Sequence, residues 1–182
     1  MTEISVIKTA FRPSNRCCAN KMNIHLPRFS EENRLIDFVD EDRSFQLYPK
    51  TLDAWKKMKE AAESDGIHLH IISAFRSIAR QSEIIEDKKR KGIPEDMIFR
   101  DSALPGYSEH HTGRAIDIGT QSHIDLEEEF ENSEAFCWLI AHARQFGFRL
   151  SYPKENPYGI AYEPWHWFFE GNAQPKSGAD GV

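Results

Sequence analysis

Two adjacent histidines and an aspartate lie within the short stretch "SEHHTGRAIDIG", residues 108–119. Imidazole nitrogens and carboxylate oxygens are donors that proteins offer to zinc, and a catalytic zinc typically takes three protein ligands and leaves a fourth position to water. Asp117 can therefore act as a ligand together with either His110 or His111. Gly113 permits the sharp bend that would bring the two donors to one point. The stretch predicts half of a metal site, and the other half must come from elsewhere in the chain.

A second motif near the C-terminus, "YEPWHW", supplies the missing donors in Glu163 and His166. With His110 and Asp117, His166 would complete a set of two imidazoles and one carboxylate, and Glu163 would stay uncoordinated. Because zinc lowers the pKa of a bound water from 15.7 to about 7, a free carboxylate beside it can take the proton. On a regular strand Glu163 and His166 would point to opposite faces, so we expect a bulge at Pro164 to turn both toward the site.

The remaining histidines have plainer interpretations as surface or satisfied core groups. Three single histidines are of this kind: His25, His123 and His142. His68 and His70 would share one face of a strand, and without a third ligand we expect a solvated or substrate-facing surface there. Ser108, His110 and Asp117 also have the residue types of a hydrolase triad. However, no G-x-S-x-G elbow surrounds the serine, which disfavours nucleophilic serine chemistry.

The composition limits the class of protein. A chain of 182 residues suits a single domain over 1–182, which can bury roughly 70% of its unfolded surface without disulfides. The net charge of −6 disfavours a nucleic-acid partner, because such partners usually require a basic patch. Cys17, Cys18 and Cys137 form neither an even-numbered disulfide framework nor a C-x-x-C zinc motif, so we expect reduced thiols.

The sequence carries no targeting or membrane signal. Its beginning has charges throughout and no apolar run of the kind found in signal peptides. No stretch approaches the ~20 apolar residues of a membrane helix. These features predict a cytoplasmic protein with no membrane span; the alternative is a secreted protein given without its signal segment, which would show the same features.

Hydrophobic periodicity predicts two helices and a strand in the first half of the chain. Apolar residues at helical spacing indicate a helix over 51–63 that Gly66 ends. The alternation in "IHLHIISAF", 67–75, indicates a strand. Ser77 then begins a second helix, and Gly92 ends it.

The second half is predicted to contain a loop, a short strand and a helix. Residues 94–105 are interpreted as a loop, and 114–118 as a strand whose Ile116 and Ile118 point away from Asp117. A helix is expected over about 133–145 and is stopped by Gly147. Its core-facing residues are predicted to be Phe136, Leu139, Ile140 and Ala143.

Two aromatic segments, "FGFRLSYP" and "GIAYEPWHWFF", are predicted to be short strands on either side of the turn-rich "KENPYG". The first 28 residues lack a clean period and are expected to be irregular, and the tail over 170–182 is expected to be loose. Helices that alternate with short strands predict an α+β domain with a small sheet.

The residues singled out above match the motifs of a known family. The pattern S-x-H-x-x-G-x-A-x-D runs from Ser108 to Asp117, and E-x-W-H runs from Glu163 to His166. The segment "ISAFRSIARQ" looks like the family's strand-turn-helix segment that carries an arginine and a downstream glutamine. Over roughly 47–169 the chain resembles the zinc D,D-peptidases of the VanY and VanXY type, also called LAS peptidases.

The resemblance implies a zinc centre with one Zn²⁺ per chain. It selects His110 over His111 and implies ligation by His110, Asp117 and His166, with Glu163 as general base and acid. A LAS/Hedgehog-type zinc peptidase fold, with a small antiparallel sheet flanked by helices, is implied as well.

Further roles follow from the same resemblance. Arg76 is expected to polarise the scissile carbonyl and stabilise the oxyanion, a task that suits a permanently charged guanidinium. Ser108 and Gln81 are expected to line the pocket for the substrate's terminal carboxylate, and Tyr107 and Trp165 to wall the cleft. The plainer alternatives are a capping serine, a surface glutamine and core aromatic residues.

The activity that the resemblance implies is zinc-dependent hydrolysis of D-Ala-D-Ala-terminated peptidoglycan precursors or stem peptides by metal-activated water. The alternatives are a peptidoglycan peptidase of other bond specificity, such as an L,D-carboxypeptidase or a phage-type endolysin, and a non-enzymatic zinc-binding module. Glu163 and Arg76 count against the last, because a structural zinc needs neither. Loops that limit substrate length decide between dipeptidase and carboxypeptidase, so motifs alone leave that choice and the oligomeric state open.

Overall fold

The protein is α+β, as the sequence predicts, in a computed structural model that describes residues 26–123 and 126–171. The strands are β1 (Ile36–Asp40), β2 (Arg43–Leu47), β3 (His70–Ser73), β4 (Ala115–Gly119), β5 (Phe148–Leu150) and β6 (His166–Phe169). The α-helices are α1 (Pro49–Ser64), α2 (Ile78–Arg90), α3 (Glu95–Arg100) and α4 (Glu134–His142). The 3-10 helices are η1 (Glu109–Thr112), η2 (Glu128–Asn132) and η3 (Ala143–Phe146).

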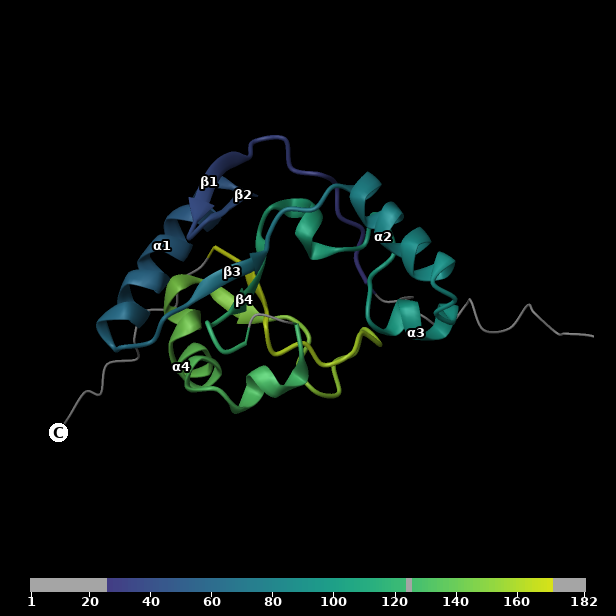
Figure 1. Ribbon diagram of the computed structural model, residues 1–182. Coiled ribbons are helices and arrows are strands. Elements are labelled where there is room, and N and C mark those ends of the chain that lie inside the picture. Colours follow the sequence, from purple (N-terminus) through teal and green to yellow (C-terminus); the bar gives the residue numbers. More distant parts are fainter. Residues whose placement is uncertain (1–25, 124–125, 172–182) are drawn as a thin grey trace, which may run out of the picture.

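Four strands form the sheet that positions the site. Their order is β3-β4-β6-β5 and every neighbouring pair is antiparallel, while β1 and β2 form a separate hairpin. In Figure 1, α1 and α2 lie on opposite sides of the molecule, and β3 and β4 lie between them. The register places Asp117 of β4 opposite His166 of β6 and opposite Ser73 of β3.

The two faces of this sheet have different roles, because successive side chains of a strand point to opposite sides. The side chains of the central strands that join the hydrophobic core are Ile116, Ile118, Trp167 and Phe169. Helices α1 and α4 cover that face with Leu52, Trp55, Met58, Ala62, Ala135, Trp138 and Leu139. Asp117 and His166 occupy the alternate positions, so they lie on the face away from the core.

The strongest periodic segments fold as predicted. Helix α1 contains the predicted 51–63 and begins two residues earlier, with a proline in its first turn. Ser77 is the N-cap of α2, and its hydroxyl accepts a hydrogen bond from the Arg80 amide at 3.0 Å. The strand predicted over 67–75 is shorter, since β3 pairs with β4 only from His70 and its register shifts after Ile71.

Three predictions that concern the helices are wrong. The segment 94–105 contains the helix α3, whose six residues are too few to show a helical period. The helix predicted over 133–145 stops at His142 and tightens into η3. Ile140, predicted to face the core, is 56% exposed, because α4 buries only the face that carries Trp138 and Leu139.

The β1–β2 hairpin was not predicted. Its five paired positions alternate charged or polar residues with a few apolar ones, and Val39 remains 66% exposed. Phe38 and Phe45 lie opposite each other, with ring centroids 5.9 Å apart, and pack against the core. The hairpin is anchored to the core by this aromatic pair and by Leu47, which is fully buried, and such tertiary contacts are a weak signal in a sequence.

None of the helices within 26–123 and 126–171 combines the length and the apolar character that a membrane span needs. The predictions for Cys17, Cys18 and His25, for most of the segment 1–28 and for nearly all of the tail lie outside the described residues.

Candidate active site

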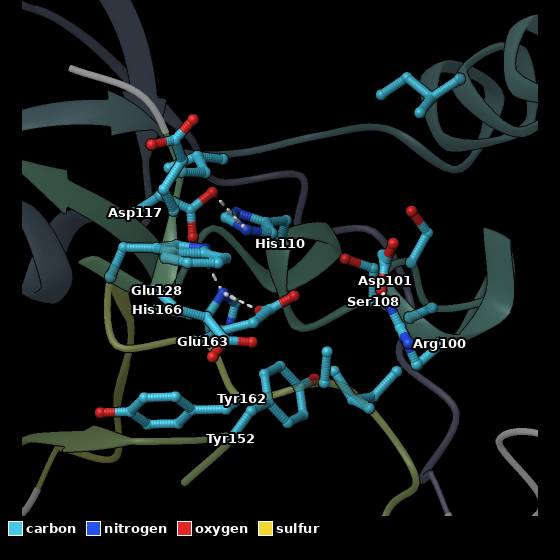
Figure 2. A pocket seen from close by; sticks show the side chains of 18 of the residues that line it. Arg100, Asp101, Ser108, His110, Asp117, Glu128, Tyr152, Tyr162, Glu163 and His166 are labelled. Carbon is cyan, nitrogen blue, oxygen red and sulfur yellow. Dashed lines mark hydrogen bonds and ion pairs between the residues drawn. The ribbon is translucent and has the colours of Figure 1, made fainter. Parts of the chain in front are cut away.

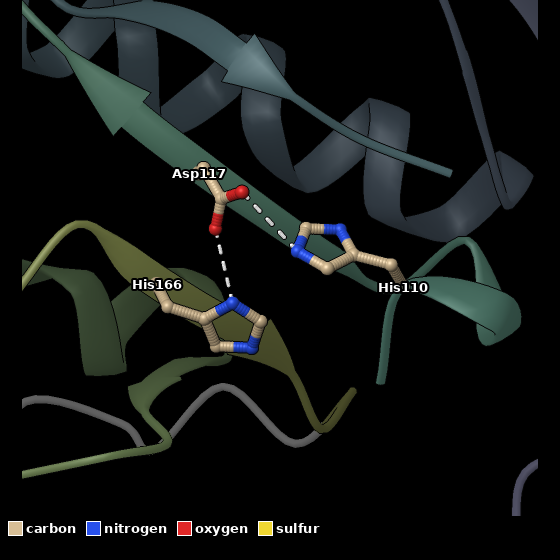
Figure 3. Close-up of side chains that lie close together, drawn as sticks. All are labelled: His110, Asp117 and His166. Atoms are coloured by element: carbon tan, nitrogen blue, oxygen red, sulfur yellow. Dashed lines mark hydrogen bonds and ion pairs between the residues drawn. The ribbon is translucent and has the colours of Figure 1, made fainter. Parts of the chain in front are cut away.

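Three residues from three elements converge on the open face of the sheet. Asp117 lies between two imidazoles: its Oδ1 is 3.0 Å from Nδ1 of His166, and its Oδ2 is 3.2 Å from Nε2 of His110 (Figure 3). All three side chains are buried. Strand pairing fixes Asp117 and His166 opposite each other, and η1 brings in His110. The sequence motifs placed far apart in the chain therefore form one cluster.

The outward-facing nitrogens of both rings are already engaged. His110 donates from Nδ1 to the Ala74 carbonyl at 2.7 Å, and His166 holds Glu109 Oε2 through Nε2 at 2.9 Å. His110 therefore turns Nε2 toward Asp117, and His166 turns Nδ1 toward it. The three donor atoms lie within 4.8 Å of one another. Two imidazoles and one carboxylate fit the donor set of a catalytic zinc site.

Glu163 approaches this cluster without joining it. Its Oε2 lies 3.7 Å from Nδ1 of His166, the nitrogen that faces the metal ligands. The bulged strand predicted around Pro164 is not formed: β6 begins at His166, and a turn closed by a 3.1 Å hydrogen bond from the His166 amide to the Glu163 carbonyl precedes it. This turn allows both side chains to face one site. Burial raises the pKa of Glu163 to about 7, against the opposing influence of His166.

Electrostatic coupling within the cluster is strong. Burial disfavours the imidazolium of His166, but hydrogen bonds to Asp117 and Glu109 outweigh it and raise its pKa to about 10. Burial also works against the Asp117 carboxylate, yet the neighbouring histidines hold its pKa well below the usual range. The pKa of His110 is lowered, chiefly by burial. Without metal, His166 is thus protonated at both ring nitrogens and donates one hydrogen bond to Asp117 and one to Glu109.

Arg76 lies in the connection between β3 and α2, at the edge of the same cleft. Its guanidinium donates to Gln81 Oε1 at 2.9 Å and to Ser73 Oγ at 3.2 Å. Gln81 is 1% exposed and also donates to the Ala103 carbonyl at 2.7 Å. Gln81 is therefore no surface residue: both ends of its amide are engaged, and one of them holds the arginine.

Of the other three residues expected to bind substrate, two line the cleft and one does not. Ser108 lines the cleft, and its hydroxyl does not cap the helical turn that follows it. Trp165 lines the cleft as well and also packs against the main core. Tyr107 is not brought to the cleft wall: it packs against the small cluster of Leu26, Tyr152 and Ile160.

The cleft itself is large and continues well beyond the metal-binding cluster. It encloses about 1040 Å³. Figure 2 shows His110, Asp117, Glu163 and His166 on one side of it and Arg100 and Asp101 on another, with Tyr152 and Tyr162 along its wall. A large volume beside a cluster of shifted pKa values is typical of an enzyme active site.

Sequence reasoning missed Glu109, and it considered His111 only as an alternative metal ligand. Glu109 is 5% exposed, and its Oε2 is hydrogen-bonded to Nε2 of His166, which is distant in the sequence. His111 is fully buried, pairs through Nδ1 with the Arg76 carbonyl at 2.6 Å and accepts the Gly106 amide at Nε2 at 3.1 Å. Both flank His110 in the motif, and this adjacency was the one available signal. Both ring nitrogens of His111 are thus engaged, and His111 braces the site.

This donor set, with a glutamate and an arginine beside it in a cleft, is typical of a metallopeptidase. The family model of VanY, D-alanyl-D-alanine carboxypeptidase, matches residues 44–172. The chain belongs to this family and is a metallopeptidase of the D,D-carboxypeptidase kind.

Two relatives are similar over most of the chain. YodJ of Bacillus subtilis is 31% identical over 184 residues, which cover 96% of this chain and 67% of YodJ. The bifunctional D-Ala-D-Ala dipeptidase and D-Ala-D-Ala carboxypeptidase VanXYC of Enterococcus gallinarum is 30% identical over 82% of this chain and 80% of its own length.

Solved structures show the same fold. The L,D-carboxypeptidase LdcB is 31% identical with a TM-score of 0.68, over 79% of this chain and 71% of that chain. A vancomycin-resistance D,D-pentapeptidase VanY in complex with Zn(II) is 26% identical with a TM-score of 0.62, over 80% of this chain and 83% of that chain. The relatives include a zinc-bound enzyme, in agreement with the zinc that the motifs predict.

Proposed function

We propose that this chain is a zinc-dependent D,D-carboxypeptidase that removes the terminal D-alanine from D-Ala-D-Ala-ended peptidoglycan precursors or stem peptides. The observation that carries the proposal is the His110, Asp117 and His166 group with Glu163 beside it, at one side of a large cleft. The solved relatives that bind Zn(II) and D-Ala-D-Ala support the choice of metal and substrate.

His110 through Nε2, Asp117 through its carboxylate and His166 through Nδ1 would hold the zinc ion. When bound in such a site, zinc polarises a carbonyl and lowers the pKa of its water to about 7. The chain's own contribution is to hold these donors rigidly, because the outer nitrogen of each imidazole is fixed by Ala74 or Glu109.

Glu163 would act as general base and then as general acid. Its carboxylate is partly buried, and a pKa of about 7 suits a group that must take a proton and later return it near neutral pH. From its place next to His166, Glu163 can take the proton of the attacking water and pass it to the departing amine.

Arg76 would stabilise the negative charge that develops on the scissile carbonyl oxygen. Two of its nitrogens are oriented by Gln81 and Ser73, so the guanidinium is held in place before substrate arrives. Ser108, whose hydroxyl does not cap η1, would donate to the substrate's terminal carboxylate. Gln81 would act on the same pocket through Arg76.

The extent of the cleft favours a carboxypeptidase over a strict dipeptidase. Its volume of about 1040 Å³ lies at the upper end of the ~300–1,000 Å³ that drug-sized ligands occupy. A dipeptide would leave most of that space empty. The side chains farther along the cleft, including Lys88, Arg100 and Tyr162, would contact residues of a longer peptide.

The test offers the purified protein D-Ala-D-Ala and a stem pentapeptide ending in D-Ala-D-Ala side by side, with and without a chelator. We expect chelator-sensitive release of D-alanine, with a higher kcat/KM on the pentapeptide. Release that a chelator leaves unchanged would contradict the zinc mechanism.

Glu163→Gln tests the base. We expect a loss of at least ~100-fold in kcat with zinc stoichiometry unchanged, whereas Glu83→Gln on the exposed side of α2 should behave like the wild type. Undiminished turnover in Glu163→Gln would remove Glu163 from the mechanism.

A second candidate is an L,D-carboxypeptidase, which is favoured by the similarity to LdcB at 31% identity and a TM-score of 0.68. The same residues would perform the same steps on a peptide whose penultimate residue is of L configuration. A stem tetrapeptide ending in L-Lys-D-Ala separates the two: preferred hydrolysis of the tetrapeptide over the pentapeptide would select this second function.

A further inference from the structure

Glu109 is a buried carboxylate that performs no chemical step in the mechanism described above. Its side chain points away from the cluster of metal ligands toward the far side of His166. It has three hydrogen-bonding partners: Nε2 of His166 at 2.9 Å, Oγ of Ser151 at 2.5 Å and Nη2 of Arg149 at 2.9 Å. A buried charge is tolerated only where such partners compensate it, so the arrangement is a built feature of the fold.

We propose that Glu109 is the positioning residue that orients His166 and thereby sets the zinc affinity of the site. Its Oε2 accepts the proton on Nε2 of His166, so the Nδ1 position, 3.0 Å from Oδ1 of Asp117, is the one at which zinc would replace a proton. The proposal rests on the zinc site of the proposed function, but not on the identity of the substrate.

The two histidine ligands are supported unequally. The outer nitrogen of His110 binds a neutral backbone carbonyl, that of Ala74, whereas the outer nitrogen of His166 binds an ionised carboxylate. A carboxylate that accepts a hydrogen bond from the outer nitrogen makes the imidazole a stronger donor to a metal and fixes its tautomer. His166 is therefore the ligand whose donor strength a side chain controls, and Glu109 is the side chain that controls it.

The surroundings restrain Glu109 and the His166 ring together. Arg149 occupies Oε1 of Glu109 and is itself held by Glu170 through its Nε at 2.8 Å. This leaves Oε2 for His166 and Ser151. The ring of Tyr152 lies 4.9 Å from that of His166 and limits its rotation. The network links η1, β5 and β6, so the ligand is held by three elements.

A purely structural role is the competing explanation, in which Glu109 only joins η1 to β5. Zinc affinity distinguishes the two roles, because a tie between elements would affect unfolding but not the donor strength of His166. The decisive variant is Glu109→Gln, which keeps the shape of the side chain and removes its charge. The affinity is measured by competition with a chromogenic chelator at fixed pH.

We expect Glu109→Gln to bind zinc roughly 10- to 100-fold more weakly than the wild type. Glu170→Gln is the matched control: it removes the carboxylate behind Arg149 and leaves the Glu109–His166 contact intact, so its zinc affinity should stay within about twofold of the wild type. Zinc affinity of Glu109→Gln within twofold of the wild type would overturn the proposal. Equal weakening in both variants would also overturn it, since the effect would then belong to the network as a whole.

A second measurement keeps the inference testable if Glu109→Gln folds poorly. Nitrogen-15 spectra of the zinc-loaded wild type should show His166 protonated at Nε2, and Glu109→Asp, which shortens the side chain, should retain this tautomer with weaker zinc binding. An Nδ1-protonated His166 in the wild type would refute the assignment. If zinc binding weakens as expected while no D-alanine is released, the proposed activity fails and this inference stands. If D-alanine is released while Glu109→Gln binds zinc normally, the proposed activity stands and the role of Glu109 is refuted.

Discussion

Arg76 illustrates how completely a single side chain is held in this site. Both terminal nitrogens of its guanidinium are bound, by Gln81 and Ser73, and its own carbonyl pairs with the buried His111. Its backbone amide donates to the His110 carbonyl at 3.2 Å, so the arginine and a metal ligand are tied directly together. A charge held in this way needs little reorganisation when the oxyanion forms.

Replacing Arg76 by lysine tests that role. Lysine keeps the positive charge, but it lacks the planar guanidinium whose two nitrogens donate to Gln81 and Ser73. We therefore expect kcat to fall by roughly 10²–10³-fold. Steady-state kinetics on the stem pentapeptide gives the change, and metal analysis should show unchanged zinc content. Arg80→Lys on α2, where the arginine is exposed and pairs with Glu83, is the matched control and should keep full activity. A loss confined to KM would instead assign Arg76 to substrate binding.

The group of His110, Asp117 and His166 that could hold a metal was predictable from the sequence, whereas the contact of Glu109 was not. His110, Asp117 and His166 are uncommon residue types at motif spacing, and their chemistry is explicit in their side chains. Glu109 acts on a residue 57 positions away, and only the pairing of β4 with β6 brings the two together. A local pattern cannot encode such a distant contact, so a glutamate next to a ligand looks like any other surface charge.

At the scale of elements, the short helical turn η1 distributes three successive side chains to three places. Glu109 reaches His166 on β6, His110 joins the metal ligands, and His111 braces the Arg76 segment and the turn at Gly106. This works because a 3-10 turn rotates each residue by about a third of a circle. Gly113 ends the turn, with a φ of 62°, and returns the chain to β4.

Gly113→Ala is therefore expected to be costly in two ways. The residue has a left-handed φ of 62°, and a Cβ there would lie 2.7 Å from Leu35 Cδ2 and 2.9 Å from the Tyr48 backbone nitrogen. Gly92→Ala is the matched control, because Gly92 has a φ of 75° and open space around it. We expect about 1 kcal/mol of destabilisation for Gly92→Ala and ~2–4 kcal/mol for Gly113→Ala.

Urea unfolding of the two variants measures the difference. Both substitutions place alanine at a left-handed φ. The additional loss of unfolding free energy in Gly113→Ala therefore reports the close contact of its Cβ with Leu35 and Tyr48. Equal free energies of unfolding would show that the Leu35 and Tyr48 segment moves aside without cost.

The elements that could be predicted are those with a strong period or an explicit cap. The apolar spacing of α1 and the capping serine of α2 are local signals, and both helices form as expected. Helix α3 is too short for a period, and the β1–β2 hairpin depends on its tertiary contact with the core. The turn before β6 was mistaken for a bulge, because Pro164 fits either arrangement.

At the scale of the whole molecule, the segment before β1 is part of the active-site support although the family match begins at residue 44. The amide of Phe29 donates to the Gly106 carbonyl at 2.8 Å, and that of Glu32 donates to the His111 carbonyl at 2.9 Å. The Glu31 carboxylate accepts the Ile78 amide at the start of α2 at 2.5 Å. The segment thus braces the same pieces of chain that carry Arg76 and the metal ligands.

The buried titratable groups of the site should also govern how the stability of the metal-free protein depends on pH. The pKa of His166 is raised to about 10, so its stabilising contribution is complete below about pH 6.5 and is lost as the pH rises through 10. Glu163, with a pKa raised to about 7, acts in the same direction: it favours the folded state below its ordinary pKa and ceases to do so as the pH passes 7. The pKa values of Asp117 and Glu109 are lowered, so their contributions are lost on acidification.

We therefore expect the metal-free protein to be most stable at mildly acidic pH and to lose a few kcal/mol between about pH 6.5 and 9.5. For a chain of this size that corresponds to a fall in Tm on the order of 10 °C. Zinc should raise Tm more at pH 8.5 than at pH 6, because it replaces the proton that His166 must release. Calorimetry with and without zinc measures both effects.

Asp117→Asn is the control. It removes a carboxylate that holds the His166 proton, so it should reduce the fall in Tm between pH 6.5 and 9.5. A metal-free Tm that stays level or rises from pH 6.5 to 9.5 would show that this proton is not held in the folded site.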